Sequence, residues 1–396
     1  MSFEFATAQR IVFGAGKLRD LPNLAEGMGR RAALVTGSSA ERIAPVFQTL
    51  KESGANPAAF SIKGEPTTER IAELARQARE QGCDFVVAFG GGSVIDAGKA
   101  IAALLTNTRD LMDYLEVIGK GEPLTEEPAP CIAIPTTAGT GAEVTRNSVL
   151  LSTEHRVKVS MRHPKMLPTL ALVDPELTLS MPPEVTASTG LDAFIQLLEA
   201  FVSIKANPLT DGLCREGLKK AARALPRAYV RGDDLPAREE MAMASLFGGL
   251  VLANAGLGAV HGFAGPLGGM FNAPHGLVCA TLLPAVFAAN VQALEERDAE
   301  SPALNKYREV ARIVTGRKNA DLSDGLQWIN DLSMNLFVPG LEDFGITEVD
   351  FPTIVQKAKN ASSMKGNPIQ LTDEELTEIL ADSLRPPIDG DSTLYL

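Results

Sequence analysis

The chain is poor in cysteine, histidine and tryptophan. Its 396 residues include four cysteines, four histidines and one tryptophan. The cysteines Cys83, Cys131, Cys214 and Cys279 lie far apart and form no C-x-x-C pair. We therefore expect neither a disulfide framework nor a cysteine zinc site, and this cysteine usage is typical of a reduced, cytoplasmic protein.

The sequence also lacks an excess of basic residues and any clear targeting segment. It has 37 Lys and Arg against 49 Asp and Glu, a net charge of -12, which argues against nucleic acid and anionic membrane surfaces as partners. Residues 1–10 show no charged-then-apolar signal, and no apolar run reaches the length expected of a membrane span. We therefore expect a cytoplasmic location, with no membrane or nucleic-acid partner.

What the chain does have is a large apolar content in two successive patterns. It is 45% hydrophobic and 22% charged, which is normal for a globular protein, and it is too long for one ordinary domain. The first pattern predicts strands at 32–36, 58–62, 84–89 and 131–134, alternating with helices at 40–53, 68–81 and 95–105. The second is almost entirely helical. We predict an α/β domain with a mainly parallel sheet at 1–178 and an all-α domain at 179–396.

The segment Gly90-Gly91-Gly92-Ser93 is the strongest local signal of ligand binding. It follows the predicted strand 84–89 and precedes a helix. Glycines let the backbone approach a ligand closely, and a helix start offers free N–H groups to an anion. The pattern matches neither G-x-G-x-x-G nor G-x-x-x-x-G-K-[ST], so a glycine turn without a ligand is the alternative. We predict a phosphate-binding turn.

A second set of polar residues lies in the helical part. Asp192 and Gln196 share one face of an apolar helix, where polar groups need partners. His261 and His275 bracket a glycine-rich segment, and Pro274 places His275 in the first turn of a helix. Asp192, His261 and His275 form a two-histidine, one-carboxylate set that suits divalent iron or zinc. The alternative is a pair of hydrogen-bonded structural histidines.

The chain resembles the iron-containing, or group III, alcohol dehydrogenase family from about Phe5 to Leu384. The motifs that carry the resemblance are G-G-G-S at 90–93 with Asp96 and Lys99, P-T-T-A-G-T-G-A-E-V-T at 135–145, G-L-D-A at 190–193, P-H-G at 274–276 and M-K-G-N-P at 364–368. The resemblance implies a Rossmann-like first domain, an all-helical second domain and an active site in the cleft between them.

The resemblance also implies roles for individual residues. It implies that Gly91, Gly92 and Ser93 bind the pyrophosphate of the dinucleotide, with Asp96 in the same motif. It also implies that Thr136, Thr137 and Thr140 line the cofactor path and that Lys158 lies at the nicotinamide end. Asp192, His261 and His275 match metal ligands. A solvated strand residue is the alternative for Lys158.

Three departures from the family pattern affect the predicted chemistry. Gln196 stands where the family has a histidine ligand, and we predict it as a weak or water-bridged fourth metal partner, leaving iron or zinc open. Gly265 replaces a histidine used in proton transfer, so proton exchange would run through water or the ribose hydroxyl. Gly37 replaces an acidic residue that would bind ribose hydroxyls.

The segment Gly37-Ser38-Ser39 with Arg42 therefore bears on the choice of nucleotide. Without a carboxylate to repel it, a 2′-phosphate could be bound by Ser38, Ser39 and Arg42. The alternative is a plain serine-capped helix start. We expect NADP to be accepted, with NAD as the other candidate.

We predict a metal-assisted NAD(P)-dependent alcohol dehydrogenase or aldehyde reductase that acts on a small alcohol or aldehyde. No catalytic residue is predicted beyond the metal ligands, and we expect a homodimer or larger homo-oligomer. One alternative is an enzyme like maleylacetate reductase, in which Arg146 and Arg162 would meet a dicarboxylate. Another is a nucleotide-binding protein that has lost dehydrogenase activity, as Gln196 and Gly265 suggest.

Overall fold

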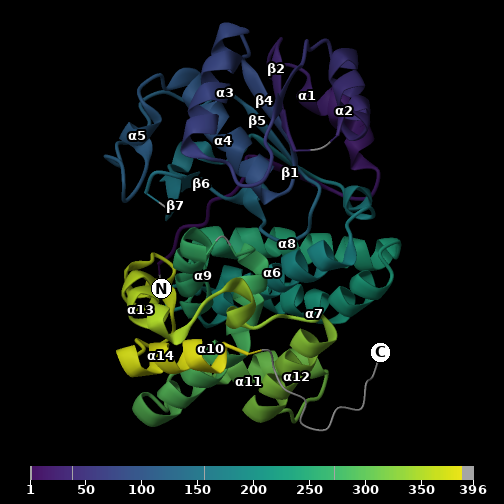
Figure 1. Cartoon of the computed structure of the whole chain (residues 1–396). Helices are drawn as coiled ribbons and strands as arrows, with labels where there is room; N and C mark the ends of the chain where they lie inside the picture. The colour runs from purple at the N-terminus through teal and green to yellow at the C-terminus, as the bar shows by residue number, and fades with distance from the viewer. Residues whose placement is uncertain (1, 38, 156, 272, 386–396) are drawn as a thin grey trace.

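The structure, a computed structural model, describes residues 2–37, 39–155, 157–271 and 273–385. An α/β half lies above an all-helical half (Figure 1). The strands are β1 (Arg10–Phe13), β2 (Ala32–Thr36), β3 (Ala58–Ser61), β4 (Phe85–Gly90), β5 (Cys131–Pro135), β6 (Asn147–Ser152), β7 (Val157–Arg162) and β8 (Leu170–Val173). The helices of the α/β half are α1 (Leu21–Ala25), α2 (Ala40–Glu52), α3 (Thr68–Glu80), α4 (Gly92–Thr106) and α5 (Leu111–Tyr114).

The helical half contains α6 (Pro183–Val202), α7 (Pro208–Val230), α8 (Leu235–Ala255), α9 (Ala259–Phe271), α10 (His275–Arg297), α11 (Pro302–Thr315), α12 (Leu322–Asn335), α13 (Phe351–Asn360) and α14 (Asp373–Asp382). Short 3₁₀ helices are η1 (Lys17–Asp20), η2 (Ala142–Val144), η3 (Pro164–Met166), η4 (Pro175–Thr178), η5 (Leu341–Phe344), η6 (Glu348–Asp350) and η7 (Met364–Gly366). The predicted fold class is confirmed, and the domain limits 1–178 and 179–396 stay a prediction.

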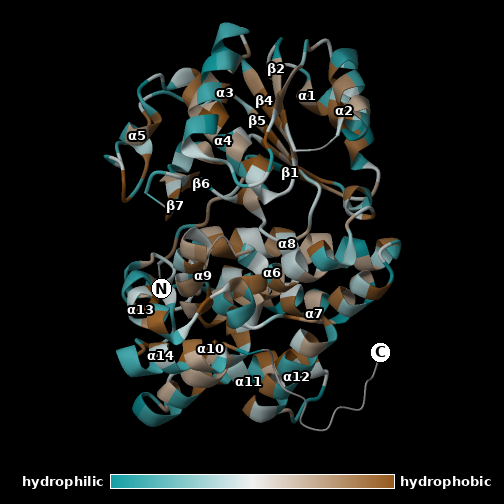
Figure 2. Ribbon diagram, viewed as in Figure 1, coloured by the Kyte–Doolittle hydropathy of each residue, from teal (hydrophilic) through white to brown (hydrophobic). Residues whose placement is uncertain are grey.

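Six parallel strands form the main sheet, in the order β1-β8-β5-β4-β2-β3. The four predicted strands are β2 to β5, whereas β1 at the edge of the sheet and its neighbour β8 were not predicted. The strands β2, β4 and β5 are buried along their whole length and include many of the hydrophobic residues in this half (Figure 2). Burial on both faces explains their continuous apolar sequences.

The strand order places the glycine turn at a ligand-binding position. The chain runs from β2 outward to β3 and then returns across β2 to β4. Open α/β sheets bind ligands beyond the carboxyl ends of strands where the order reverses. Gly37 follows β2 and Gly91 follows β4, and a Cβ built on Gly37 would lie 3.3 Å from Cγ2 of Val94 in α4. The two turns are therefore neighbours.

The helical half is built around α6, which contacts α7, α8 and α10. By length and hydropathy alone, α6 and α10 could each cross a membrane, so the expectation of no apolar segment of that length is wrong. The reason for their apolar character is core packing. Within the apolar windows of α6 and α10, 83% and 61% of residues respectively are buried inside the protein.

A backbone contact joins the two halves. The loop 136–145 follows β5, and within it Gly141 adopts a positive φ of 60°. A Cβ on Gly249 of α8 would lie 2.2 Å from the carbonyl oxygen of Gly141. A Cβ on Gly139 would lie 2.6 Å from Cβ of Thr189 in α6. The loop therefore rests directly on two helices of the other half.

A buried lysine attaches the same loop to α4. The Lys99 ammonium lies 2.9 Å from Oδ1 of Asp96 and donates hydrogen bonds to the Ala142 carbonyl and the Thr145 hydroxyl, both at 2.9 Å. Next to these contacts, Glu143 is 2% exposed. Burial raises the pKa of the Glu143 carboxyl to about 7, even though its own backbone N–H and Lys99 favour the charged form.

This raised pKa makes the stability of the protein depend on pH. In the unfolded chain Glu143 ionises near its ordinary pKa of 4.5, and in the folded chain only at about 7. The folded state therefore loses stability as pH rises from 4.5 through 7. We expect Glu143→Gln to remove this loss and to be more stable than wild type by about 1–3 kcal/mol at about pH 8.

Thermal unfolding at about pH 5 and about pH 8 measures the effect. The melting temperature of wild type should fall more between these values than that of Glu143→Gln. Glu240→Gln, which removes an α8 carboxylate in a surface ion pair with Arg223, is the control and should follow wild type. Parallel curves for wild type and Glu143→Gln would contradict the buried-carboxyl interpretation.

Candidate metal and cofactor site

Three helices bring four potential metal ligands together. Asp192 comes from α6, His261 from α9, and His275 and Cys279 from α10, and one ligand atom of each lies within 4.8 Å of the others. Asp192 and Cys279 are buried, His261 is 8% exposed and the His275 side chain is 37% exposed. No other such group of His, Cys, Asp or Glu occurs among the residues that the structure describes.

The cluster unites the predicted carboxylate and both predicted histidines. The sequence analysis expected no cysteine zinc site, whereas the structure places the Cys279 thiol among the potential ligands. That expectation rested on the missing C-x-x-C pair, which a site of mixed ligands does not need.

Both imidazoles direct Nε2 at the same carboxylate oxygen. His261 Nε2 lies 3.3 Å and His275 Nε2 lies 3.8 Å from Asp192 Oδ1. Cys279 Sγ lies 3.7 Å from His275 Nε2. Imidazole nitrogen, carboxylate oxygen and thiolate sulfur are all ligands of divalent zinc, and the first two also suit divalent iron. The donor set therefore fits a divalent ion.

Glu199 is a site residue that the sequence analysis missed. Its Oε2 lies 2.7 Å from Nδ1 of His261, and its Oε1 accepts a hydrogen bond from the Val260 N–H at 2.7 Å. A carboxylate at one ring nitrogen fixes the tautomer and leaves the other nitrogen for a metal. Glu199 lies seven residues after Asp192, on the same helix face, so this spacing was an available signal.

Gln196 supports Asp192 in this structure. Its Nε2 donates a hydrogen bond to Asp192 Oδ2 at 3.0 Å, whereas its buried Oε1 has no hydrogen-bond partner. A metal contact of Gln196 stays a prediction. On α9, a Cβ built on Gly265 would meet no neighbouring group within 4 Å. No other side chain therefore occupies the space beside Gly265, where the family has a histidine.

The cluster is electrostatically coupled. Burial opposes ionisation of Asp192, but His261 and His275 outweigh it and the pKa of this carboxyl is lowered. Burial opposes protonation of His261, but Cys279, Asp192 and Glu199 raise its pKa well above the ordinary value. Burial alone would raise the pKa of the Cys279 thiol, yet the two histidines lower it.

The predicted pyrophosphate residues lie at the start of α4, against the loop 136–145. Gly91 is the N-cap of α4, and Gly92 and Ser93 form its first turn, where N–H groups have no partner within the helix. A Cβ on Gly91 would make an ordinary 3.4 Å contact with Thr137. A Cβ on Gly92 would lie 2.8 Å from the Thr140 side chain.

The other residues on the cofactor path lie in the same region. Thr136 is buried, and its N–H donates to the Gly90 carbonyl at 2.9 Å. Asp96 is engaged by Lys99 and accepts a hydrogen bond from the Val149 N–H at 3.0 Å. Their contact with a dinucleotide stays a prediction.

Lys158 extends from β7 toward the helical half. Its ammonium pairs with Glu65 at 2.9 Å, and its side chain is only 11% exposed. A Cβ on Gly268 of α9 would lie 3.6 Å from Lys158 Nζ. This burial argues against the solvated strand residue that was the alternative.

The region predicted to choose between NAD and NADP is only partly described. Ser38 lies outside the described residues, and Ser39 is the N-cap of α2 without a side-chain cap bond. Arg42 donates a hydrogen bond to Ser180 Oγ at 3.0 Å. A Cβ on Gly37 would lie 2.9 Å from the Ile62 carbonyl oxygen, so glycine has a steric role there whichever nucleotide binds.

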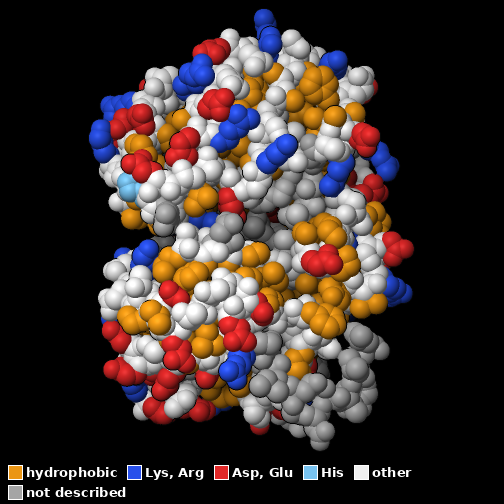
Figure 3. Space-filling view, viewed as in Figure 1, with side chains coloured by type: hydrophobic (Ala, Val, Ile, Leu, Met, Phe, Trp, Pro, Cys, Tyr) orange, Lys and Arg blue, Asp and Glu red, His pale blue; other side chains and the backbone are white. Residues whose placement is uncertain are grey.

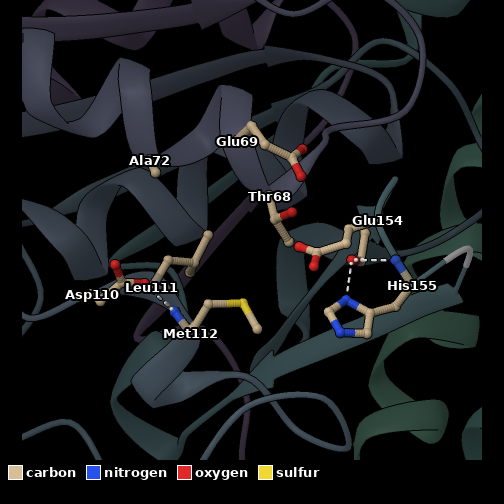
Figure 4. A pocket seen from close by; sticks show the side chains of 9 residues that line it. Thr68, Glu69, Ala72, Asp110, Leu111, Met112, Glu154 and His155 are labelled. Atoms are coloured by element: carbon tan, nitrogen blue, oxygen red, sulfur yellow. Dashed lines mark hydrogen bonds between the residues drawn. The ribbon is translucent and has the colours of Figure 1, made fainter.

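The space-filling view shows a waist between the two halves, with hydrophobic side chains gathered on the helical side (Figure 3). A separate pocket of about 220 Å³ lies on the α/β half and is lined by Thr68, Glu69, Ala72, Asp110, Leu111, Met112, Ser152, Glu154 and His155 (Figure 4). It contains none of the predicted site residues, and Nδ1 of His155 is already bonded to Ser152 Oγ at 3.0 Å. We assign this pocket no part in the chemistry.

Known protein families match both halves of the chain. The family model described as iron-containing alcohol dehydrogenase matches residues 8–175, and the C-terminal model of the Fe-containing alcohol dehydrogenase family matches residues 186–384. The 1,3-propanediol dehydrogenase of Klebsiella pneumoniae is 36% identical over 89% of this chain and 90% of its own. The 4-hydroxybutyrate dehydrogenase of Cupriavidus necator is 33% identical over 96% and 99%.

Solved structures give the same result. A crystal structure of 1,3-propanediol oxidoreductase superposes with a TM-score of 0.89 at 31% identity, covering 97% of this chain and 100% of that one. Sulfoacetaldehyde reductase from Bifidobacterium kashiwanohense, in complex with NAD+, gives 0.86 at 30% identity, covering 97% and 99%. The chain therefore belongs to the iron-containing alcohol dehydrogenase family, whose members are oxidoreductases acting on CH–OH groups.

Proposed function

We propose that the protein is a metal-assisted NAD(P)-dependent alcohol dehydrogenase or aldehyde reductase whose site lies between its two halves. One observation carries the proposal. The loop 136–145, beside the glycine turn of α4, contacts Thr189, and Asp192 of the ligand cluster follows three residues later on α6. This contact supports a short path between a bound dinucleotide and the cluster.

In this proposal each half has its own task. Gly91, Gly92 and Ser93 bind the pyrophosphate through N–H groups at the start of α4. A divalent ion held by Asp192 and the two histidines would supply Lewis acidity to the substrate oxygen. Gly265 offers no titratable group, so proton exchange would need water or the ribose hydroxyl of a bound dinucleotide.

The names of the relatives support a small alcohol or aldehyde as substrate, since they include 1,3-propanediol and 4-hydroxybutyrate dehydrogenases. A dicarboxylate is less well supported, because Arg162 already pairs with Glu116 at 3.2 Å. The gathered ligand cluster favours an enzyme over a nucleotide-binding protein without activity. We also propose a homo-oligomer in the cytoplasm, where the four free cysteines suit a reducing compartment.

The first test of the proposal concerns the glycine turn. Gly91→Ala adds a Cβ that the protein itself accommodates, so a loss of affinity reports on the ligand. Gly92 is unsuited because its Cβ would collide with Thr140. We expect the cofactor dissociation constant, measured by titrating protein fluorescence, to rise at least about tenfold, or about 1.4 kcal/mol.

The control for Gly91→Ala is Gly212→Ala on α7, where a Cβ would meet nothing within 4 Å. It should leave cofactor affinity unchanged. A folded Gly91→Ala protein that binds NAD and NADP like wild type would remove the turn from the cofactor site.

The second test concerns the nucleotide. In this proposal Arg42 exchanges its hydrogen bond to Ser180 for one to the 2′-phosphate of the bound nucleotide. Arg42→Ala should then raise the Michaelis constant for NADPH about five- to tenfold, because a charge-assisted hydrogen bond is lost. The constant for NADH should barely change. Steady-state kinetics with both nucleotides measures this, and Ser180→Ala controls for loss of the existing hydrogen bond. Equal effects of Arg42→Ala on both nucleotides would exclude the phosphate contact.

The third test concerns the metal. His275→Ala removes a predicted ligand but leaves the dinucleotide residues untouched. We expect at least a 100-fold loss of metal-dependent alcohol oxidation, since even a lost outer-shell partner costs 10- to 100-fold, with cofactor affinity retained. His155→Ala, at the unrelated pocket, should keep its rate. Metal-independent turnover, with His275→Ala as active as wild type, would overturn the metal mechanism.

A further inference from the structure

We propose that Cys279 is the fourth protein ligand of the metal site, replacing the imidazole that Gln196 lacks, and that the site therefore prefers zinc to iron. The inference rests on the proposed function of the same site. It assigns a ligand and a metal preference to this chain.

The geometry of α10 presents the thiol to the cluster. His275 is the first residue of α10, and Cys279 follows four residues later, on the same helix face. Its Sγ lies 3.7 Å from His275 Nε2 and within 4.8 Å of the ligand atoms of Asp192 and His261. Cys279 has no exposed surface, so its thiol lies against these groups and not in solvent.

Gln196 is turned away from the role of ligand. Its N–H group, which has no lone pair to offer a metal, faces Asp192 Oδ2 at 3.0 Å. Its Oε1, which could bind a metal, faces α8, where a Cβ built on Gly248 would lie 2.8 Å from it. With Gln196 in this orientation, α6 supplies Asp192, α9 supplies His261, and α10 supplies both His275 and Cys279.

The donor set determines the metal. One sulfur, two nitrogens and one oxygen match tetrahedral zinc, and zinc can expand to five ligands when a substrate arrives. Thiolate is a soft ligand that favours zinc over divalent iron. On binding, the thiol releases its proton to solvent and a sulfur–metal bond forms, so no oxidant or reductant is required.

Cobalt(II) provides a direct test, because thiolate ligation gives it a near-ultraviolet charge-transfer band that oxygen and nitrogen ligands do not give. Protein stripped with a chelator is titrated with Co²⁺. We expect wild type to develop this band, and Cys279→Ser and Cys279→Ala to bind Co²⁺ without it. The zinc affinity of both variants should fall by at least about tenfold, because the loss of even an outer-shell partner costs about 10- to 100-fold in metal affinity.

Cys83→Ser is the matched control, since Cys83 is buried outside the cluster, and it should keep the band. Stoichiometric Zn²⁺ should displace Co²⁺ and bleach the band, whereas Fe²⁺ under anaerobic conditions should require an excess. Cobalt bound to wild type without the band, or a band that survives in Cys279→Ser, would overturn the assignment. A reversed order of displacement would overturn the preference for zinc.

These outcomes can be separated from the proposed function. Metal-dependent turnover without the band would overturn Cys279 as a ligand while the dehydrogenase proposal stands. The band without turnover on any alcohol or aldehyde would support Cys279 and count against the dehydrogenase proposal.

Discussion

The contact between the loop 136–145 and the helices α6 and α8 is the constraint on which the proposed site depends. Gly141 and Gly249 meet backbone to backbone, and Gly139 lies against Thr189. On the other side, Lys99 holds the same loop to α4 with hydrogen bonds to backbone and hydroxyl oxygens. The start of α4 and the ligand-bearing face of α6 are thereby positioned by one short segment.

The sequence was sufficient for most of the fold. Buried strands such as β4 carry continuous apolar runs, and Pro274 marks the start of α10, so both were predictable. The strands β1 and β8 were not predicted, although β3, which is equally short, was. β3 lies between the helices α2 and α3 and so continues a visible alternation of strand and helix, whereas β1 and β8 have no such helices on both sides. Their pairing depends on contacts between residues that are distant in the chain.

The site was predictable only where residue types are rare and motifs are shared. Asp192, His261 and His275 were identified, and the structure places them together. Glu199 and Cys279 were missed, because the role of a carboxylate or thiol on an apolar helix depends on neighbours that are distant in the sequence. Gly37 was interpreted through a missing charge, whereas the structure adds a steric requirement from the Ile62 carbonyl.

The meeting of Gly141 and Gly249 also has a consequence for protein engineering. Neither position leaves space for a methyl group, since the added Cβ would lie 2.4 Å from Cα of Gly249 in one case and 2.2 Å from the Gly141 oxygen in the other. A chimera that joins the α/β half of this chain to the helical half of a relative can reproduce the junction only if the incoming α8 also has glycine there. At this contact, compatibility between two such halves depends on only these two residues, which can be read from the sequences before any gene is assembled.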